Sequence, residues 1–253
     1  MGRRSEKRHW ERFWEGSREI EDVYDTGGRV IGALEGRCAA SGARVLEVGA
    51  GSGRDSIELA RRGAEVWVVD YTPSALRLIA AQDGGETLRR VGGDARQLPF
   101  RDACFDVVFH QGLLEHFRDP QPLLRENARV LRTGGILLVD VPQRWHYYTP
   151  LKHVAIAADR WFAGWETEFS IGELRRLLRG VGLRPVHAYG DWCVPNLFYR
   201  MARKALLGVG VRLPLQPRLP LLGPALERLR HGLATTPLSL YTGMNIGCVA
   251  RKE

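Results

Sequence analysis

Short runs of hydrophobic, often β-branched residues alternate with amphipathic segments along most of the chain. The hydrophobic runs lie at 45–49, 65–70, 105–110 and 135–142, and a short strand is expected near 88–91. Helical patterns open near Asp55, at Pro73 after the potential N-cap Thr72, and at about Pro120. Strands that alternate with helices of about ten to fifteen residues are typical of a parallel sheet covered on both faces. The pattern therefore predicts an α/β fold.

The alternation is interrupted twice in the second half of the chain. An aromatic, irregular stretch fills about 143–169, after which Ser170 is expected to cap a helix that leads into a strand near 183–189. The second interruption, about 191–242, holds six of the thirteen prolines and precedes a last strand at 243–251. We expect one domain over 41–253 with two insertions on its substrate side, preceded by a helical segment over 1–40. A lid or an oligomer contact would produce the same pattern.

A glycine-rich turn follows the first predicted strand. Glu47 is followed by glycines at 49, 51 and 53, and a helical pattern begins at about Asp55. Glycines at this spacing let the backbone approach a ligand closely, and the helix start offers N–H donors. Such a turn alone is a weak signal. The dinucleotide fingerprint would place its third glycine at position 54, where Arg54 stands, and this makes a nicotinamide cofactor less favoured.

Two acidic residues follow at the ends of the next predicted strands. Asp70 ends the second strand and Asp94 follows the third. A carboxylate at the second strand end can accept hydrogen bonds from both ribose hydroxyls, and the next can bind the exocyclic amine of adenine. In the alternative interpretation, Asp70 caps a helix and Asp94 lies in a turn. Together with the glycine loop, the two carboxylates predict an adenosine site.

Five ordered motifs resemble the class I S-adenosylmethionine-dependent methyltransferases, particularly the group related to ubiquinone and menaquinone biosynthesis. They are VLEVGAGSGRDS (45–56), VVDYTPSAL (68–76), GDARQLPF (93–100), FDVVFHQGLLEHF (105–117) and LLRENARVLRTGGILLVDVP (123–142). The resemblance implies a Rossmann-like, doubly wound sheet of seven strands, mostly parallel with the last strand antiparallel. It also implies that S-adenosylmethionine is bound by Glu47, Gly49, Ala50, Gly51, Gly53, Asp70, Tyr71, Asp94, Ala95, Gln111 and Gly112.

Methyl transfer from a sulfonium is an in-line displacement, which needs positioning but neither a metal nor a covalent intermediate. A base is needed only where the acceptor must lose a proton. The weak candidates for that role are His116, His146, His153 and Glu166. Each is more readily explained as a wall or surface residue, and His116 as part of a helix start, so no catalytic residue is assigned.

The net charge of +8 is concentrated in one part of the chain. Between Trp192 and Thr242 there are seven basic residues and one acidic residue, and residues 199–233 interleave arginine with leucine, valine and proline. This pattern is typical of a contact with a membrane surface, and a core-packing or dimer-forming segment would give it at least as readily. Without a recognisable nucleic-acid module, we expect no nucleic-acid partner. Four dispersed cysteines and the lack of a signal sequence favour the cytoplasm.

The sequence thus predicts an enzyme that transfers a methyl group from S-adenosylmethionine to a small-molecule or lipid-like acceptor. The acceptor type is a quinone or phenol, a glycolipid or a natural product. One alternative is an NAD(P)-dependent oxidoreductase with an irregular fingerprint. Another is a non-catalytic partner subunit that retains the cofactor pocket.

Overall fold

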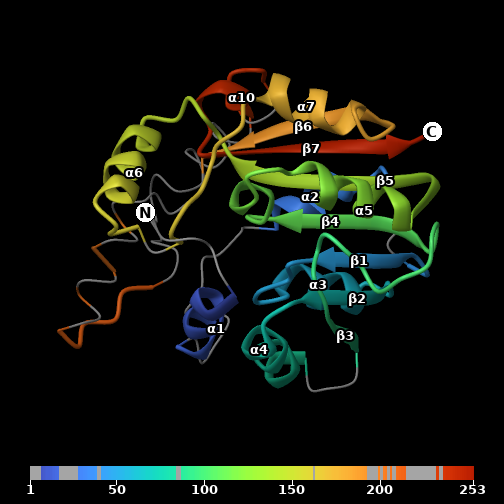
Figure 1. The fold of residues 1–253 in the computed structure, drawn as a ribbon, viewed down its shortest axis with the longest axis horizontal. Coiled ribbons are helices and arrows are strands. Elements are labelled where there is room, and N and C mark those ends of the chain that lie inside the picture. The colour runs from blue at the N-terminus through green and yellow to red at the C-terminus, as the bar shows by residue number, and fades with distance from the viewer. Residues whose placement is uncertain are drawn as a thin grey trace.

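A computed structural model describes most of the chain. The described residues are 7–16, 28–38, 41–83, 87–161, 163–192, 199, 202–203, 206, 209–214, 232–233 and 236–253. Its centre is one seven-stranded sheet with the order β3-β2-β1-β4-β5-β7-β6 (Figure 1). The strands are β1 (Arg44–Val48), β2 (Glu65–Asp70), β3 (Leu88–Gly92), β4 (Phe105–Gln111), β5 (Leu131–Pro142), β6 (Leu183–Asp191) and β7 (Asn245–Lys252). The predicted Rossmann-like α/β fold is confirmed.

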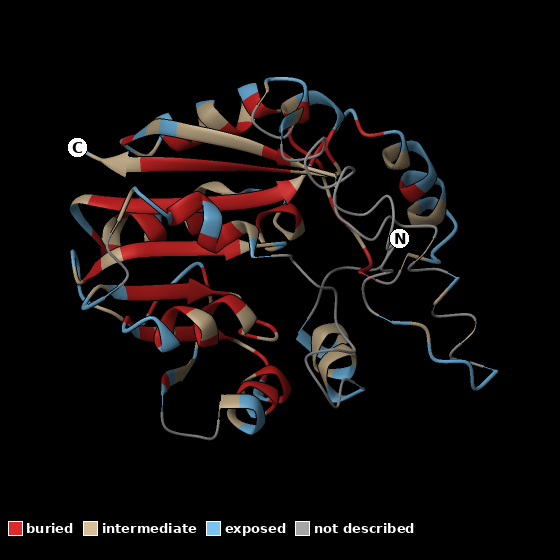
Figure 2. Cartoon of the chain, turned by 180° about the vertical axis from the view of Figure 1, so that it is seen from behind, coloured by how far each residue is buried: buried red, intermediate tan, exposed pale blue. Residues whose placement is uncertain are grey.

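Helices cover both faces of this sheet. The described helices are α1 (Lys7–Glu15), α2 (Arg29–Leu34), α3 (Arg54–Arg61), α4 (Pro73–Asp83), the 3₁₀ turn η2 (Leu114–His116), α5 (Gln121–Val130), α6 (Tyr148–Ala157), α7 (Ile171–Arg179) and α10 (Ser239–Thr242). One apolar cluster joins α5 and α7 to the sheet, and another joins α2, α3 and α4 to it from the other side. The strands are therefore mostly buried (Figure 2), which explains their nearly continuous apolar runs.

The strand order reverses between β1 and β4. The chain runs outward from β1 through β2 to β3, then returns to place β4 on the other side of β1. The neighbours from β3 to β5 pair in parallel, whereas β7 is antiparallel to both β5 and β6, as expected for the last strand. In open α/β sheets, ligands bind beyond the carboxyl ends of the strands at such a reversal.

Several predicted boundaries need correction. The strand predicted at 135–142 is longer, because α5 ends at Val130 and β5 begins at once at Leu131 and continues through Gly134 and Gly135. Thr72 precedes α4, but its hydroxyl donates to Asp70 at 2.6 Å. Ser170 does cap α7, in a capping box with Glu173. The first insertion is only partly irregular, because it contains α6.

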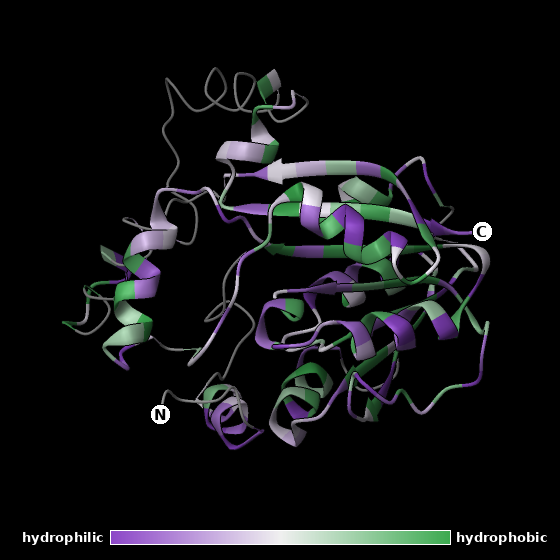
Figure 3. Ribbon diagram, turned by 45° about the horizontal axis from the view of Figure 1, so that its top comes forward, coloured by the Kyte–Doolittle hydropathy of each residue, from purple (hydrophilic) through white to green (hydrophobic). Residues whose placement is uncertain are grey.

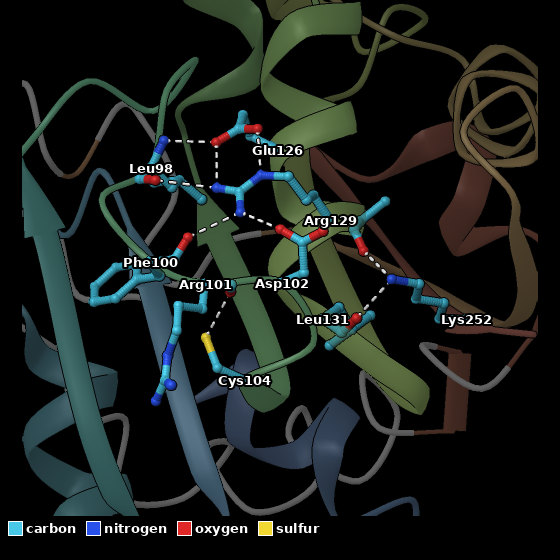
Figure 4. A network of polar contacts seen from close by, with 10 residues as sticks. Leu98, Phe100, Arg101, Asp102, Cys104, Glu126, Arg129, Leu131 and Lys252 are labelled. Carbon is cyan, nitrogen blue, oxygen red and sulfur yellow. Dashed lines mark hydrogen bonds and ion pairs between the residues drawn. The ribbon is translucent and has the colours of Figure 1, made fainter.

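Arg129 of α5 forms hydrogen bonds to the loop that precedes β4 (Figure 4). Its guanidinium donates to both carboxylate oxygens of Glu126, to Asp102 and to the carbonyls of Leu98 and Phe100, over 2.7–3.0 Å. Glu126 also accepts from the Leu98 N–H at 2.7 Å. Because charge-assisted hydrogen bonds are the strong ones, this network fixes the loop that follows Asp94.

The basic segment 199–233 lies largely outside the described residues, so its predicted membrane contact remains a prediction. None of the helices that the structure describes is long and apolar enough to cross a bilayer. Hydrophobic residues are frequent in the central strands, while many helix positions are hydrophilic (Figure 3).

Candidate functional site

A cavity of about 940 Å³ opens at the carboxyl ends of the central strands. Ten of the eleven predicted cofactor residues line it: Glu47, Gly49, Ala50, Gly51, Asp70, Tyr71, Asp94, Ala95, Gln111 and Gly112. Gly53 instead occupies the N-cap position of α3. The structure therefore brings together residues from the ends of β1, β2, β3 and β4 that are far apart in sequence.

The glycine loop takes a backbone form that suits glycine. Gly49, Gly51 and Gly53 have φ values of 65°, 53° and 63°, in the left-handed region. The N–H groups of Gly49 and Ala50 both donate to the carbonyl of Val69, at 2.7 and 3.1 Å. A Cβ on Gly49 would lie 2.6 Å from a Leu113 methyl carbon, so the Leu113 side chain would have to move. The backbone conformation therefore favours glycine where the loop borders the cavity.

Asp70 is buried between the glycine loop and the start of α4. Its Oδ2 accepts from the Gly51 N–H at 3.1 Å, and its Oδ1 accepts from the N–H and hydroxyl of Thr72 at 2.9 and 2.6 Å. Burial raises the pKa of this carboxyl, although the hydrogen bonds oppose the shift. Asp70 therefore contacts the residue before helix α4, as expected if it caps that helix, and it also lines the cavity.

Asp94 differs from Asp70 because it is more exposed and already paired. The Arg96 guanidinium donates to its Oδ2 at 2.6 Å, and this contact lowers the pKa of Asp94. Arg96 lines the cavity beside it. An adenine amine would meet a carboxylate that is ionised and shared with an arginine.

Two polar groups at the inner end of the cavity are buried. Glu47 accepts from the Ser56 hydroxyl at 2.6 Å, and burial raises its pKa well above the ordinary value. Gln111 donates through Nε2 to Asp55 at 2.6 Å, while its buried Oε1 meets no hydrogen-bond donor among the described residues. A buried acceptor without a donor is costly, so this oxygen fits a ligand donor such as an ammonium group.

The weak candidates for proton transfer divide into two groups. His116, His146 and Glu166 line the cavity. His153 does not; its ring Nε2 lies 2.8 Å from Glu168 and its side chain is 53% exposed. The structure places His153 as a surface partner of Glu168 rather than at the cavity wall.

A buried ion cluster on the first insertion was not predicted from sequence. Lys152 of α6 contacts Glu166 at 2.8 Å and Glu168 at 2.6 Å, and all three side chains are less than a tenth exposed. Burial alone would lower the pKa of Lys152, but the two carboxylates raise it. Lys152 and Glu166 both face the cavity, so the cluster forms its charged wall.

Glu115 on η2 was also missed, although it lies in the motif that contains His116. Its side chain is buried, it lines the cavity, and its Oε2 meets no hydrogen-bond donor in the described part of the chain. Burial, and then the negative charge of Glu166, raise the pKa of Glu115 well above the ordinary value. The motif that carries the family resemblance includes this position, but nothing in the sequence indicated that this glutamate would be buried.

We expect the variant Glu115→Gln to be more stable than the wild type at neutral pH and equally stable at acidic pH. In the folded chain this carboxyl keeps its proton to a higher pH than it does unfolded, so wild-type stability falls as the pH rises above the ordinary glutamate value. The glutamine does not ionise and avoids this loss. Urea unfolding between about pH 4 and about pH 8 measures the difference in stability between this variant and the wild type. Glu15→Gln, at an exposed site, is the control, and an equal pH dependence of Glu115→Gln and wild type would contradict the assignment.

Arg29 of α2 is a further cavity residue that sequence reasoning missed. It donates to both oxygens of Asp140 at 3.0 Å and to Asp191 at 3.2 Å. Tyr189 donates to Asp140 at 2.8 Å. Burial raises the pKa of Asp140, and the Arg29 charge opposes that shift. No local motif marks Arg29, because its partners lie more than a hundred residues away in sequence.

Comparison with known proteins matches the central part of the chain to a methyltransferase family. Residues 46–139 match the family described as "Methyltransferase domain". The chain is 38% identical over 104 residues to demethylmenaquinone methyltransferase of Thermobifida fusca, and 36% identical over 111 residues to ubiquinone biosynthesis O-methyltransferase of Xylella fastidiosa. These matches cover 40% and 43% of this chain. They span 44% and 45% of the relatives, less than half of their length.

The fold is shared with solved methyltransferase structures. Magnesium protoporphyrin IX methyltransferase from Synechocystis PCC 6803, solved with bound SAH, superposes with a TM-score of 0.59. The match covers 90% of this chain and 82% of that chain, at 14% sequence identity. At this identity the likeness concerns the fold alone.

Proposed function

Because residues 46–139 form a class I methyltransferase domain, we propose that the chain transfers the methyl group of S-adenosylmethionine to a small-molecule acceptor. The observation that carries this proposal is the convergence of the glycine loop, Asp70 and Asp94 on one cavity. Three strand ends thereby present the groups that an adenosine needs: close backbone, a carboxylate for the ribose and a carboxylate for the amine.

The residues of the cavity fit this cofactor. Tyr71 and Ala95 border the adenosine side. Glu47 and the Oε1 of Gln111, which accepts no hydrogen bond from the residues that the structure describes, are suited to a methionine ammonium group. When bound, S-adenosylmethionine supplies an electrophilic methyl group. The protein then has to orient the acceptor for in-line attack and exclude water.

On the acceptor side, Glu115 and His116 are the groups suited to receive a proton. Both belong to η2 and both line the cavity. Burial lowers the pKa of His116, so its imidazole is neutral at physiological pH, and its Nδ1 lies 3.4 Å from the carbonyl of Trp165. A hydroxyl acceptor loses a proton on methylation, and a neutral imidazole or buried carboxylate can take it.

The acceptor class that we favour is a quinone or phenol. The names of the two curated relatives refer to demethylmenaquinone and to ubiquinone biosynthesis. Aromatic side chains at Tyr148, Trp161 and Trp165 line the same cavity and suit a flat ring. A glycolipid or natural-product acceptor, a peripheral membrane contact through 199–233, a homodimer and a cytoplasmic location stay predictions.

Calorimetric titration with S-adenosylhomocysteine tests the cofactor assignment, with NADH as the control ligand. We expect micromolar binding of S-adenosylhomocysteine and no binding of NADH. Binding of NADH instead would favour the oxidoreductase alternative and overturn the proposal. Transfer of labelled methyl to demethylated quinones and to phenols then tests the activity; cofactor binding without transfer to any acceptor would favour the non-catalytic partner subunit.

A further inference from the structure

Helix α1 borders the cavity although it lies far outside the matched methyltransferase domain. Residues Lys7, Trp10, Phe13 and Trp14 all line the cavity, so one side of this nine-residue helix faces it. Neither the domain match, which begins at residue 46, nor any motif in the sequence gives this helix a role.

Glu11 forms hydrogen bonds that hold α1 against α4. Its Oε1 accepts from the Ser74 N–H at 3.2 Å and lies 3.4 Å from the Arg77 guanidinium. The Ser74 hydroxyl donates to the backbone carbonyl of Glu11 at 3.2 Å. The two helices lie side by side (Figure 1), and α4 begins directly after Asp70 and Tyr71. The anchor of α1 is therefore next to the proposed ribose site.

From this anchor, α1 reaches both halves of the cavity. A Cβ on Gly51 would lie 2.5 Å from the Trp14 ring, so the indole lies directly against the glycine loop. Lys7 lies 5.8 Å from the centre of the Tyr71 ring, on the adenosine side. Trp10 packs edge-on against His116 with ring centres 4.8 Å apart, on the acceptor side.

We propose that helix α1 forms part of the cofactor site. In this site Glu11 is the positioning residue that holds α1 in place, and Trp14 covers the glycine loop. The proposal rests on the proposed binding of S-adenosylmethionine. It extends the site beyond the matched domain and predicts that cofactor and helix α1 stabilise each other.

The energetics of α1 make this coupling strong. None of its residues is buried, and a helix of nine residues is marginal in water without tertiary contacts. Its position therefore depends on a small number of contacts, of which those with Ser74 are central. A ligand that adds contacts to Trp14 favours the docked helix, and by linkage the docked helix favours the ligand.

Replacing Glu11 by alanine tests the proposal. We expect Glu11→Ala to weaken S-adenosylhomocysteine binding by about 5- to 10-fold, the equivalent of one lost hydrogen bond, and to speed its dissociation by a similar factor. Glu15→Ala, on the same helix but exposed, should change neither value. Calorimetry and stopped-flow displacement measure affinity and dissociation rate. Equal affinity in Glu11→Ala and wild type would overturn the proposal while leaving the proposed function intact.

Hydrogen exchange of the wild type and of Glu11→Ala gives a second, independent test. We expect S-adenosylhomocysteine to slow amide exchange over residues 7–16, and Glu11→Ala to reduce that protection. Slowed exchange in the glycine loop with unchanged exchange in α1 would show that the cofactor binds without the helix, against the proposal. Failure of the wild type to bind S-adenosylhomocysteine at all would refute the proposed function, and this inference with it.

Discussion

Replacing Lys152 by methionine is expected to lower the free energy of unfolding by about 3–5 kcal/mol, because it leaves buried carboxylates without their cation. Glu166 and Glu168 both contact the Lys152 ammonium, at 2.8 and 2.6 Å, and all three side chains are nearly inaccessible to solvent. Methionine is similar in length and apolar, so packing is largely preserved. Urea unfolding at neutral pH measures the loss.

A variant that removes all three charges separates the charge effect from packing. Lys152→Met combined with Glu166→Gln and Glu168→Gln should recover much of the lost stability, since a neutral cluster has no unpaired ion to bury. If the single and triple variants were equally unstable, the loss of unfolding free energy would come from packing rather than from unpaired carboxylates.

Much of the fold could be predicted because its signals are local. Strands β1, β2, β4 and the second half of β5 are apolar runs, as is typical of buried parallel strands, and helical patterns separate most of them. The glycine loop and Asp70 lie at strand ends, whose positions follow from the same alternation. The antiparallel β7 was expected from the family resemblance rather than from its own pattern.

The sequence pattern did not predict helix α6, because apolar residues of this helix are exposed and its lysine is buried. Leu151 and Val154 are exposed, at 58% and 69%, whereas Lys152 between them is buried. Periodicity assigns apolar residues to the inside and lysine to the outside, so it could not indicate this helix or its ion cluster. The burial of Lys152 depends on two glutamates from a separate loop, which no local rule reveals.

The N-terminal residues show a different limit of sequence reasoning. A helical segment within 1–40 was expected, and α1 and α2 are present there. Where each helix docks depends on distant partners: Ser74 for Glu11, and Asp140 and Asp191 for Arg29. The motif-bearing half of the cavity was therefore predictable, while the half closed by α1, α2 and α6 was not.

Replacing Asp70 by alanine is expected to weaken cofactor binding by about 1.5–3 kcal/mol, the range for a hydrogen bond to a charged group. Asp70 lines the cavity at the end of β2, where its carboxylate is placed to accept from ribose hydroxyls. Titration calorimetry with S-adenosylhomocysteine gives the affinity. An unchanged affinity in a folded variant would remove Asp70 from the site.

The control for this prediction has to account for the structural contacts of Asp70. The same carboxylate accepts from the Thr72 hydroxyl at 2.6 Å and from the Gly51 N–H at 3.1 Å, so its loss also loosens the loop. Thr72→Val removes the hydroxyl contact and keeps the carboxylate. If Asp70 binds the cofactor directly, Thr72→Val should cost less than about 1 kcal/mol in affinity. An equal loss in both variants would mean that Asp70 acts by holding the glycine loop rather than by contacting the ligand.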